Sequence, residues 1–455
     1  MTAFQTVVLG DFLKLYRIEH RVQDELTYKQ VTISKTKGIS FRGIKKGKDI
    51  GRKRQFKIDL DSYPNTLMFT RQGIFDGSIG IAPIEVNKCI VTENMPMMTI
   101  DTDIVEIDYL KKLLISKYLF KKIKNLKIVG SAQKSIHERD LLKITIKLPS
   151  KNDQIKMCKI FSSLDVYHSE LLLEFNNQQT ILKKLRQQIL QEAIEGKLTK
   201  EWRLQNPDTE PASELLKRIQ AEKELLLKEN KIKKQKELPV ILEKEKSFKL
   251  PSNWKWTRLQ DLSKLITDGK HGDCQNLQNS GYYFLSAKDI QNKNLIYENA
   301  RQIVPDEFQE VHNRTDLEAG DICMVNTGAT VGKLAIAPDH PFTKKTTFQK
   351  SVAVLKVIKP NVNQEFIGLF LNCQTTNLLS KSKGGAINNL LLGDLKCFLV
   401  PLPPILEQHK IVKKVDKLFA ICDELEAQID SSQTNAKELM KAVLKEAFTQ
   451  EDKVA

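Results

Sequence analysis

The chain has 455 residues, 41% of them hydrophobic, and its 72 lysines and arginines against 56 acidic residues give a formal charge of +16. This length exceeds one ordinary domain, and the hydrophobic content excludes a wholly disordered chain. No apolar run approaches the roughly 18 residues that cross a bilayer, and the first residues lack a signal-peptide pattern, so we expect neither membrane spanning nor secretion.

Two segments of the first 150 residues are strongly basic. Residues 35–54 carry nine lysines and arginines with one acid, and residues 111–134 carry eight lysines with no acid. Such density favours phosphate backbones or anionic lipid, although a basic face kept for solubility gives the same composition. Candidates for phosphate or guanine contacts are Arg42, Lys45, Lys46, Arg52, Lys53 and Arg54, with Lys344, Lys345 and Lys350 further along the chain.

An internal repeat organises the chain. A shift of 254 residues aligns residues 130–194 with 384–448 without a gap, and 19 of the 65 positions are identical. Two shorter matches extend the repeat upstream. Residues 73–83 match 328–338, and at a shift of 250 Leu9, Asp11, Lys14 and Leu15 match Leu259, Asp261, Lys264 and Leu265. A chain that repeats itself at this distance contains two related modules.

Each copy ends in a segment with helical periodicity. No glycine or proline interrupts residues 150–195 or residues 405–455. Apolar residues recur at three-, four- and seven-residue intervals, which gives each helix one apolar stripe along roughly 60 Å. Such a helix needs a partner, and the other copy is the simplest one. The stripe predicts helix–helix or partner contacts for Leu164, Leu171, Leu182, Leu185, Ile189, Leu418, Leu425, Leu439 and Val443.

The other parts of each copy have the character of compact mixed domains. Short β-rich runs at residues 143–148, 322–326, 334–337 and 351–358 lie between glycine, proline and asparagine turns. Between the copies, residues 212 to about 237 are dense in lysine and glutamate and predict a solvated connector helix. The expected order is a first domain at 1–150, a long helix at 151–200, the connector at 201–248, a second domain at 249–404 and a distal helix at 405–455.

The predicted fold class is therefore α+β, with two α/β domains in tandem pseudo-repeat separated by two long antiparallel helices in a coiled coil. Antiparallel pairing would relate the domains by a pseudo-twofold axis, which suits two half-sites on duplex DNA. Because the two copies have diverged, the half-sites should differ. Small residues permit close backbone approach, and Gln or Asn can bond adenine, so the duplicated loop supplies the base-reading candidates Gly130, Ser131, Gln133, Lys134, Gly384, Gly385, Asn388 and Asn389. A tight turn leading into Asp140 and Asp394 explains the same loop equally well.

Motifs of catalysis and metal binding are missing from the sequence. Residues 326–334 resemble a phosphate loop, but the spacing is one residue short and Leu334 stands where a Ser or Thr is needed, so we expect a turn between strands. The histidines and the seven scattered cysteines form no pair with zinc-ligand spacing, and such cysteines are typical of a reduced cytoplasmic chain. We expect a non-enzymatic chain without a cofactor or metal of its own.

Several stretches in order resemble the specificity subunits of type I restriction–modification enzymes. Residues 185–199 followed by Glu201-Trp202-Arg203 resemble the end of that family's central helix. Residues 250–259, with Trp254-Lys255-Trp256, are similar to the start of its second target-recognition domain, and residues 401–408 to the start of its distal helix. The resemblance covers nearly the whole chain. The first domain departs from it, because the chain begins without a Trp-x-Trp motif and Lys147-Leu148-Pro149-Ser150 replaces Pro-Leu-Pro-Pro.

The resemblance implies a prokaryotic, cytoplasmic DNA-reading subunit that binds double-stranded DNA and two modification (methyltransferase) subunits. Those partners would supply S-adenosylmethionine and adenine N6 methylation, and restriction subunits would add ATP- and Mg-dependent translocation and cleavage. The helices would act as a ruler for the unread spacer. Two alternatives stay open: a free-standing basic coiled-coil scaffold that binds nucleic acid or membrane surfaces by charge alone, and a DNA-binding regulator that needs no methyltransferase.

Overall fold

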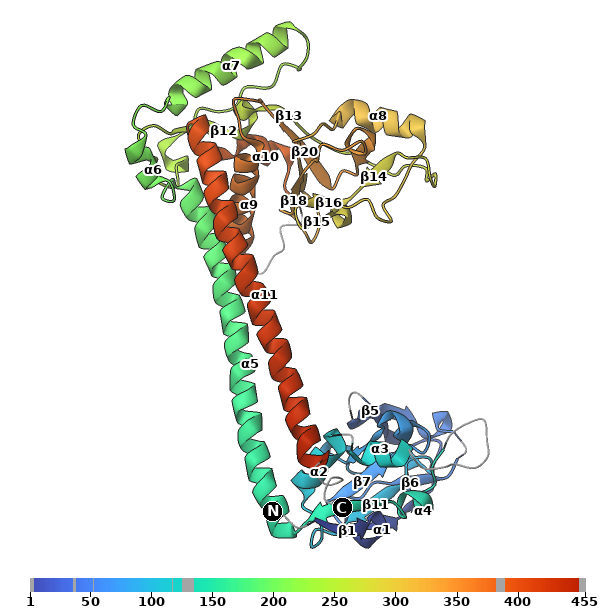
Figure 1. Ribbon diagram of the computed structural model, residues 1–455. Helices are drawn as coiled ribbons and strands as arrows, with labels where there is room; N and C mark the ends of the chain where they lie inside the picture. The colour runs from blue at the N-terminus through green and yellow to red at the C-terminus, as the bar shows by residue number, and fades with distance from the viewer. Residues whose placement is uncertain are drawn as a thin grey trace. The chain divides into compact units, whose positions relative to one another are not determined.

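The computed structural model describes residues 4–35, 38–51, 53–116, 118–124, 135–381 and 389–449. Backbone contacts divide the chain into two compact units, Met1–Asn177 with Ile429–Ala455, and Gln178–Gln428. Each unit contains one mixed domain and part of both long helices (Figure 1).

The first unit is built on three antiparallel or largely antiparallel sheets. A four-stranded sheet has the order β2 (Leu13–Tyr16), β10 (Met97–Ile100), β7 (Thr66–Phe69) and β8 (Ile79–Ile81). A five-stranded sheet has the order β3 (Glu19–His20), β6 (Gln55–Lys57), β9 (Ile90–Thr92), β4 (Thr27–Ser34) and β5 (Gly38–Lys46), with β4 and β9 parallel. The pair β1 (Phe4–Val8) and β11 (Thr145–Pro149) joins the two ends of the domain. The short helices are α1 (Leu9–Phe12), α2 (Ile107–Ile115), α3 (Tyr118–Lys124) and α4 (Glu138–Leu141), with 3-10 turns at Gly47–Asp49, Gly73–Asp76 and Ile84–Val86.

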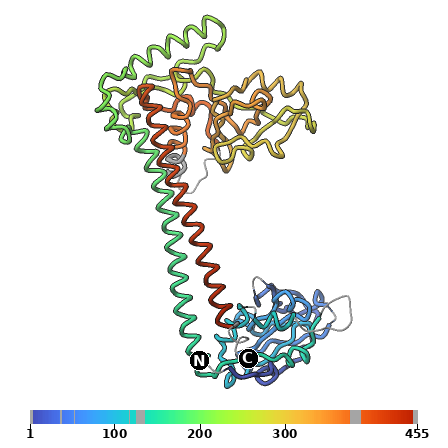
Figure 2. The backbone as a smooth tube through the Cα atoms, viewed as in Figure 1, coloured from blue at the N-terminus to red at the C-terminus, as the bar shows by residue number. Residues whose placement is uncertain are grey.

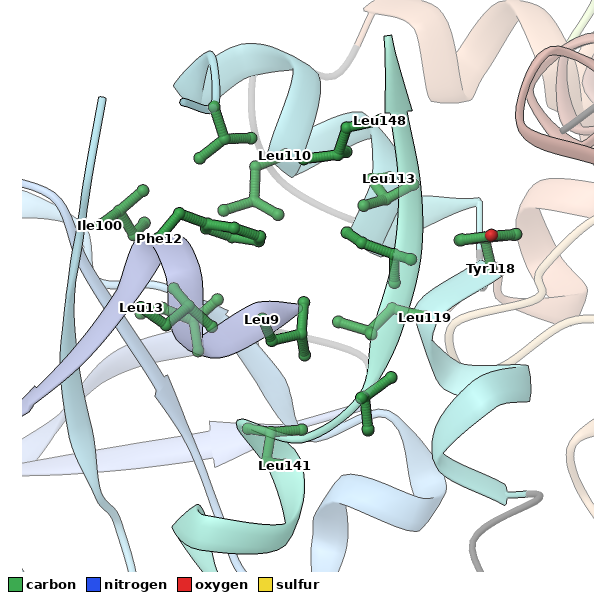
Figure 3. Close-up of a cluster of buried hydrophobic side chains, with 14 of the residues drawn as sticks. Leu9, Phe12, Leu13, Ile100, Leu110, Leu113, Tyr118, Leu119, Leu141 and Leu148 are labelled. Carbon is green, nitrogen blue, oxygen red and sulfur yellow. The ribbon is translucent and has the colours of Figure 1, made fainter. Parts of the chain in front are cut away.

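The core of this domain lies between the helices and the four-stranded sheet. Figure 3 shows Leu9 and Phe12 of α1 close to Leu110 and Leu113 of α2, and all four side chains are buried. Burying a leucine or phenylalanine side chain contributes about 1.5–3 kcal/mol, so this cluster is a main source of stability for the domain. A second cluster, around Phe56 and Ile58, packs the five-stranded sheet.

The second domain repeats part of this plan. Its four-stranded sheet has the order β13 (Ser263–Asp268), β20 (Val352–Val357), β17 (Ile322–Val325) and β18 (Leu334–Ile336), and β12 (Lys255–Arg258) pairs with β21 (Leu399–Leu402). Two small pairs are β14 (Tyr283–Leu285) with β19 (Thr346–Phe348), and β15 (Ile290–Gln291) with β16 (Asn294–Leu295). The helices are α6 (Lys200–Gln205), α7 (Ala212–Lys228), α8 (Pro305–Thr315), α9 (Gln364–Lys381) and α10 (Leu392–Cys397), with 3-10 turns at Glu243–Glu245, Leu259–Leu262, Ala287–Asp289 and Thr343–Lys345.

The sheets confirm the sequence repeat. The orders β2-β10-β7-β8 and β13-β20-β17-β18 are the same, and both domains close with an antiparallel pair of their first and last strands. The predicted strands at 143–148, 322–326, 334–337 and 351–358 correspond to β11, β17, β18 and β20. Residues 326–333 connect β17 to β18, which confirms a turn rather than a phosphate loop.

A buried glutamine repeats the same contacts at the start of both long helices. Gln154 and Gln408, which align in the repeat, are fully buried. Each side-chain amide donates to a carbonyl five residues earlier, at 3.0 Å, and each side-chain oxygen accepts a backbone N–H from a loop, that of Glu106 at 2.8 Å and that of Asn363 at 2.9 Å. Each domain is therefore attached to its helix through the same polar contacts.

The two long helices are α5 (Lys151–Ile194, 44 residues) and α11 (Ile405–Thr449, 45 residues), which confirms the predicted length. Within the second unit they run antiparallel, because residue numbers rise along one as their partners fall along the other. Arg186 pairs with Asp423 at 2.6 Å, and the carbonyl of Leu198 accepts from Lys414 at 2.7 Å. Figure 2 shows these two segments side by side in this unit.

The predicted stripe residues fall into two groups. Leu182 and Ile189 are buried, Leu164 packs against the core of the first domain, and Leu418 and Val443 are half-buried. The exposed group is Leu171, Leu185, Leu425 and Leu439, whose side chains are 41–65% exposed. A helix of 3.6 residues per turn drifts away from a seven-residue repeat over many turns, which accounts for their greater exposure. Their contact with partner subunits stays a prediction.

The connector helix α7 ends at Lys228, earlier than the predicted residue 237. Asn230 has a φ of +56°, and the N–H of Lys231 donates back to the carbonyl of Leu226, which is a common way for a helix to end. One face of α7 is buried through Leu215 and Ile219, so the prediction of a solvated helix is wrong. The alternation of Lys and Glu concealed a short apolar stripe.

Two further expectations can be compared with the structure. All seven cysteines are free thiols. Within the part of the chain that the structure describes, none of the helices combines the length and apolarity needed to traverse a bilayer.

Candidate nucleic-acid interface

The β4–β5 hairpin carries the first group of basic candidates. Arg42, Lys45 and Lys46 are exposed on β5, which is the edge strand of the five-stranded sheet. The register between the strands shifts by one residue at Arg42, and Gly43 has a φ of +142°. A bulge of this kind changes the direction of neighbouring side chains. The structure therefore places three predicted cations on one exposed strand.

The other basic candidates lie on separate segments. Lys53 and Arg54 are exposed just before β6, whereas Arg52 lies outside the described residues. In the second domain, Lys344 and Lys345 are exposed on the 3-10 turn Thr343–Lys345, and Lys350 is exposed after β19. Exposed cations of this kind are available to phosphates.

The duplicated loop lies mostly outside the described residues, including Gly130, Ser131, Gln133, Lys134, Gly384, Gly385 and Asn388. Asn389 is described and exposed, and its side-chain oxygen accepts from the hydroxyl of Thr327 at 3.0 Å. The end of the loop is held in the same way in both domains. The N–H of Ile136 donates to the backbone carbonyl of Arg71 at 3.0 Å, and the N–H of Leu390 donates to the backbone carbonyl of Asn326 at 2.7 Å. Arg71 and Asn326 are the residues that align in the repeat.

A buried carboxylate supports this loop end in the first domain. Glu138 is 5% exposed and accepts from Arg71 at 2.8 Å and from Arg17 at 2.9 Å. Burial opposes its ionisation, but the hydrogen bonds from Arg71 and Arg17 outweigh this effect and hold the pKa of Glu138 below its usual value. Arg17 is half exposed, so this cluster fixes the loop end and presents a cation beside it.

A second buried carboxylate, Glu407, joins three segments of the second domain. It is fully buried and accepts from Arg203, from Thr199 at 2.6 Å and from the indole N–H of Trp254 at 2.8 Å. Arg203 also donates to the carbonyl of Gly196 at 2.7 Å. Gly196 has a φ of +72°, and a Cβ there would meet the ring of Pro251 at 2.9 Å, so glycine is required.

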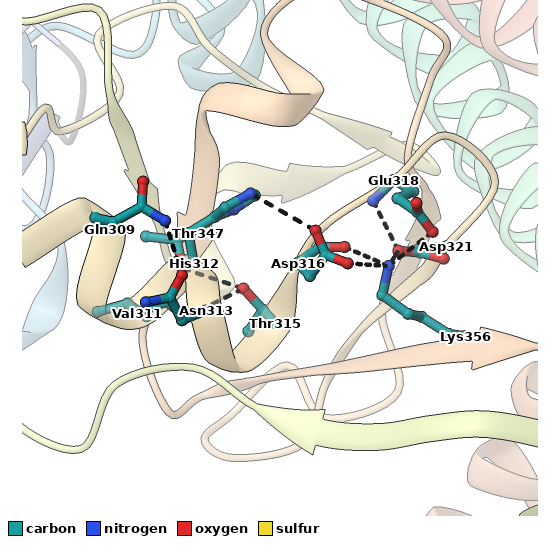
Figure 4. Close-up of polar contacts among 10 residues, drawn as sticks. All are labelled: Gln309, Val311, His312, Asn313, Thr315, Asp316, Glu318, Asp321, Thr347 and Lys356. Atoms are coloured by element: carbon teal, nitrogen blue, oxygen red, sulfur yellow. Dashed lines mark hydrogen bonds and ion pairs between the residues drawn. The ribbon is translucent and has the colours of Figure 1, made fainter. Parts of the chain in front are cut away.

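A buried lysine organises the far side of the same domain. Lys356 of β20 is 8% exposed, and its ammonium lies 2.9 Å from Asp321, 3.0 Å from Glu318 and 3.8 Å from Asp316 (Figure 4). Burial lowers the pKa of Lys356, but these carboxylates outweigh it and raise the pKa. Burial raises the pKa of Asp321, and the nearby Glu318 adds to this, although Lys356 opposes it. The cluster is structural, and sequence reasoning did not identify it.

Comparison with known proteins identifies the second half of the chain. Residues 251–432 match the family model described as the type I restriction modification DNA specificity domain. The EcoEI type I restriction enzyme specificity subunit of Escherichia coli is 31% identical over 266 residues, which is 55% of this chain and 42% of that protein. The EcoAI specificity subunit of Escherichia coli is also 31% identical, over 58% of this chain and 44% of that protein. The matches thus span less than half of these relatives.

Solved structures extend the likeness of fold to nearly the whole chain. A chain from a structural study of complex assembly and conformational transition of the type I R-M system aligns with a TM-score of 0.57 at 17% identity, covering 98% of both chains. The HsdS subunit from Thermoanaerobacter tengcongensis aligns with a TM-score of 0.51 at 15% identity, covering 98% of this chain and 96% of that one. At such identities the likeness shows the fold alone.

Proposed function

We propose that the chain belongs to the type I restriction–modification specificity family, whose DNA specificity domain matches residues 251–432, and that it reads an asymmetric, bipartite sequence in duplex DNA. The observation that carries the proposal is the structural repeat, because two copies of one sheet plan suit two half-sites. The copies differ in the groups beside their duplicated loop, with an arginine at 71 and an asparagine at 326. Different half-site sequences follow from that divergence.

In this proposal the chain performs no chemistry and recruits enzymes. Two modification subunits would bring S-adenosylmethionine and methylate adenine, and restriction subunits would bring ATP- and Mg-dependent cleavage. The exposed leucines on the long helices support recruitment, since Leu171, Leu185, Leu425 and Leu439 leave apolar surface uncovered. Such surface is typical of a helix that receives a partner. The lengths of α5 and α11 would set the number of unread base pairs.

The decisive experiment is a map of methylated adenines in cells that express the chain with its modification partner. We expect one motif made of two different short sequences with a fixed unread spacer between them. As a second arm, whole helical turns are added to α5 near Leu182–Ile189 and to the facing part of α11. The spacer should lengthen while both half-sites keep their bases. A change in the bases, or methylation without a motif, contradicts the proposal.

The charge-only scaffold makes a different prediction. It binds any polyanion, so its DNA binding at high salt would show no competition that depends on sequence. It also gives no reason for two domains with the same strand order. A free-standing regulator would bind its site tightly without a methyltransferase, and the same binding experiment with and without the modification partner separates it from the proposal.

A further inference from the structure

A basic groove of about 330 Å³ lies on the second domain beside the β15–β16 turn. Three lysines and three side-chain amides are among the residues that line it: Lys288, Lys293, Lys333, Gln291, Asn292 and Asn372. None of the described residues that line it is acidic. The three lysines are exposed, and none forms an ion pair among the described residues. A groove of this composition concentrates positive charge without internal neutralisation.

The turn that carries Lys293 has an unusual residue for its geometry. Asn292 has a φ of +48° and Lys293 a φ of +63°, and Gln291 pairs with Asn294 on either side. Two consecutive positive φ angles make the type I′ turn that normally carries Asn-Gly. A lysine at the second position costs on the order of 1 kcal/mol relative to glycine. A side chain kept at that cost is a candidate for function.

The position of the turn is fixed against the long helix. The ammonium of Lys293 lies 5.2 Å from the centre of the Phe419 ring of α11, and the guanidinium of Arg186 of α5 lies 5.5 Å from the same ring. Cation–π contacts of this kind contribute roughly 0.5–1 kcal/mol at exposed sites. The turn therefore has a defined place on the helix pair of this unit.

The third lysine, Lys333, lies at the end of the turn before β18. Gly332 has a φ of +95°, and a Cβ there would meet the Thr375 hydroxyl of α9 at 2.8 Å. The N–H of Val325 donates to the carbonyl of Lys333 at 2.7 Å, which fixes Lys333 at the beginning of β18. Both β15 and β16 pack against β18 (Figure 1), so the lysines converge on one place through rigid elements.

The first domain contains a related arrangement. Its β4–β5 hairpin packs against β8, the counterpart of β18. Gly77, which aligns with Gly332 in the repeat, has a φ of +94°, and the side chain of Lys35 approaches within 4.0 Å of its Cβ position. In the first domain a lysine at the end of a hairpin strand thus lies beside this glycine, and in the second domain Lys288, Lys293 and Gly332 line one groove.

From these observations we propose that the groove of Lys288, Lys293 and Lys333 seats a backbone phosphate of the DNA duplex that the second domain reads. The proposal rests on the proposed function, because it assigns the ligand of one surface of the same DNA-binding chain. Ammonium groups recognise phosphate as point charges, and phosphate contacts fix the position of a protein on DNA without reading bases. The groove would therefore set the register of the second domain on its half-site.

The test is the salt dependence of DNA binding by the full chain with its modification partner. The probe is a mixed-sequence duplex, and the variant combines Lys288→Ala, Lys293→Gly and Lys333→Ala. Each lost phosphate contact should lower the slope of log affinity against log salt by about 0.9, which corresponds to about eightfold in affinity between 1 M and 0.1 M salt. We expect the slope to fall by about 0.9, for the one phosphate that the groove seats, and the methylated motif to keep its bases.

A matched control removes the same charge elsewhere. Lys228, Lys233 and Lys234 are exposed on the connector, and their replacement by alanine should change the slope far less. If the slope of the groove variant is unchanged, or if the slope of the control falls equally, the assignment of a phosphate to the groove is wrong. If the triple variant does not fold, Lys293→Gly alone carries the test, because glycine suits the turn, and a smaller fall of the slope than in the triple variant is expected. If the groove variant lowers the slope of the wild type but the cells show no methylated motif, only the proposed function is overturned, and the groove stays a phosphate site.

Discussion

The two domains share a sheet plan but use the third residue of their long helices in opposite ways. Asp153 of α5 and Glu407 of α11 align in the repeat. Asp153, which is half-buried in the first turn of its own helix, accepts hydrogen bonds from the hydroxyl of Ser150 at 2.9 Å and from the ammonium of Lys156 at 3.1 Å. Glu407 follows Pro404, which has no hydroxyl to offer, and is buried among Arg203, Thr199 and Trp254.

This difference shows which part of the duplicated junction is under a shared constraint. The neighbouring glutamines, Gln154 and Gln408, keep the same contacts in both domains, so the attachment of domain to helix has been retained. The adjacent carboxylate has been recruited in the second domain to hold the start of that domain against α6. The second junction therefore depends on a buried ion pair that the first does not contain.

The largest expected effect comes from removing this ion pair. Glu407→Ala leaves the largely buried Arg203 without its carboxylate, and breaking a buried pair costs about 3–5 kcal/mol of unfolding free energy. Asp153→Ala removes only a half-buried carboxylate in the first turn of the helix, paired with Lys156 and Ser150, and it should cost much less. Urea unfolding of each variant, followed by far-ultraviolet circular dichroism, measures the difference, because all three tryptophans lie in the second unit and do not report on the first.

Glu407→Gln is the informative companion, because it keeps the size and one acceptor but removes the charge. It should fall between the wild type and the alanine variant. Equal destabilisation by Glu407→Ala and Asp153→Ala would contradict the contrast between the junctions.

A second contrast lies across the four-stranded sheets. Lys356 is opposite Leu265, whereas Leu15, which aligns with Leu265, is opposite Met98, and Met98 is fully buried. Lys356→Met introduces the methionine that the first domain has at this position, but it leaves the buried Asp321 without its cation. We expect a loss of about 3 kcal/mol near neutral pH, at the lower end of the range for a broken buried pair.

The pH dependence gives this prediction its sign. The pKa of Asp321 is raised in the folded chain by burial, and loss of Lys356 should raise it further. Below that raised pKa the folded variant holds a proton that the unfolded chain has not yet bound, so the loss of stability should shrink as pH falls through it. The double variant Lys356→Met with Asp321→Asn should recover much of the loss at neutral pH. Unfolding curves at several pH values decide, and a loss that grows on acidification would contradict the assignment.

The sequence predicted the repeat, the long helices and the turn at residues 326–333, because each depends on local periodicity or spacing. It did not predict the five-stranded sheet of the first domain, whose strands are as short as the two residues of β3. Nor could it predict that Glu407 meets Arg203 and Trp254, since their side chains come together only after more than 150 intervening residues have folded.

The candidate interface was predicted unevenly for a related reason. Arg42, Lys45 and Lys46 lie together because they share one strand, and a run of charge is visible in the sequence. Lys288 and Lys293 line one groove with Lys333 only through the packing of β15 and β16 on β18, and no spacing rule connects them. The asparagine–lysine pair in positive-φ positions was the one local signal, and it resembles an ordinary polar loop.

The smallest expected effect compares the exposed lysines of the two domains. Lys45→Ala with Lys46→Ala, and Lys344→Ala with Lys345→Ala, should each change unfolding free energy by no more than about 0.5 kcal/mol, because exposed positions contribute little. If both pairs contact phosphates, each double variant should weaken binding to all sequences and lower the salt slope by about two. Lysines on the edge strand β5 have another physical use, since they discourage pairing with a second chain. If the Lys45 and Lys46 variant keeps the salt slope and begins to self-associate, these two lysines protect the edge strand. Lys344 and Lys345 lie on a 3-10 turn and have no such alternative.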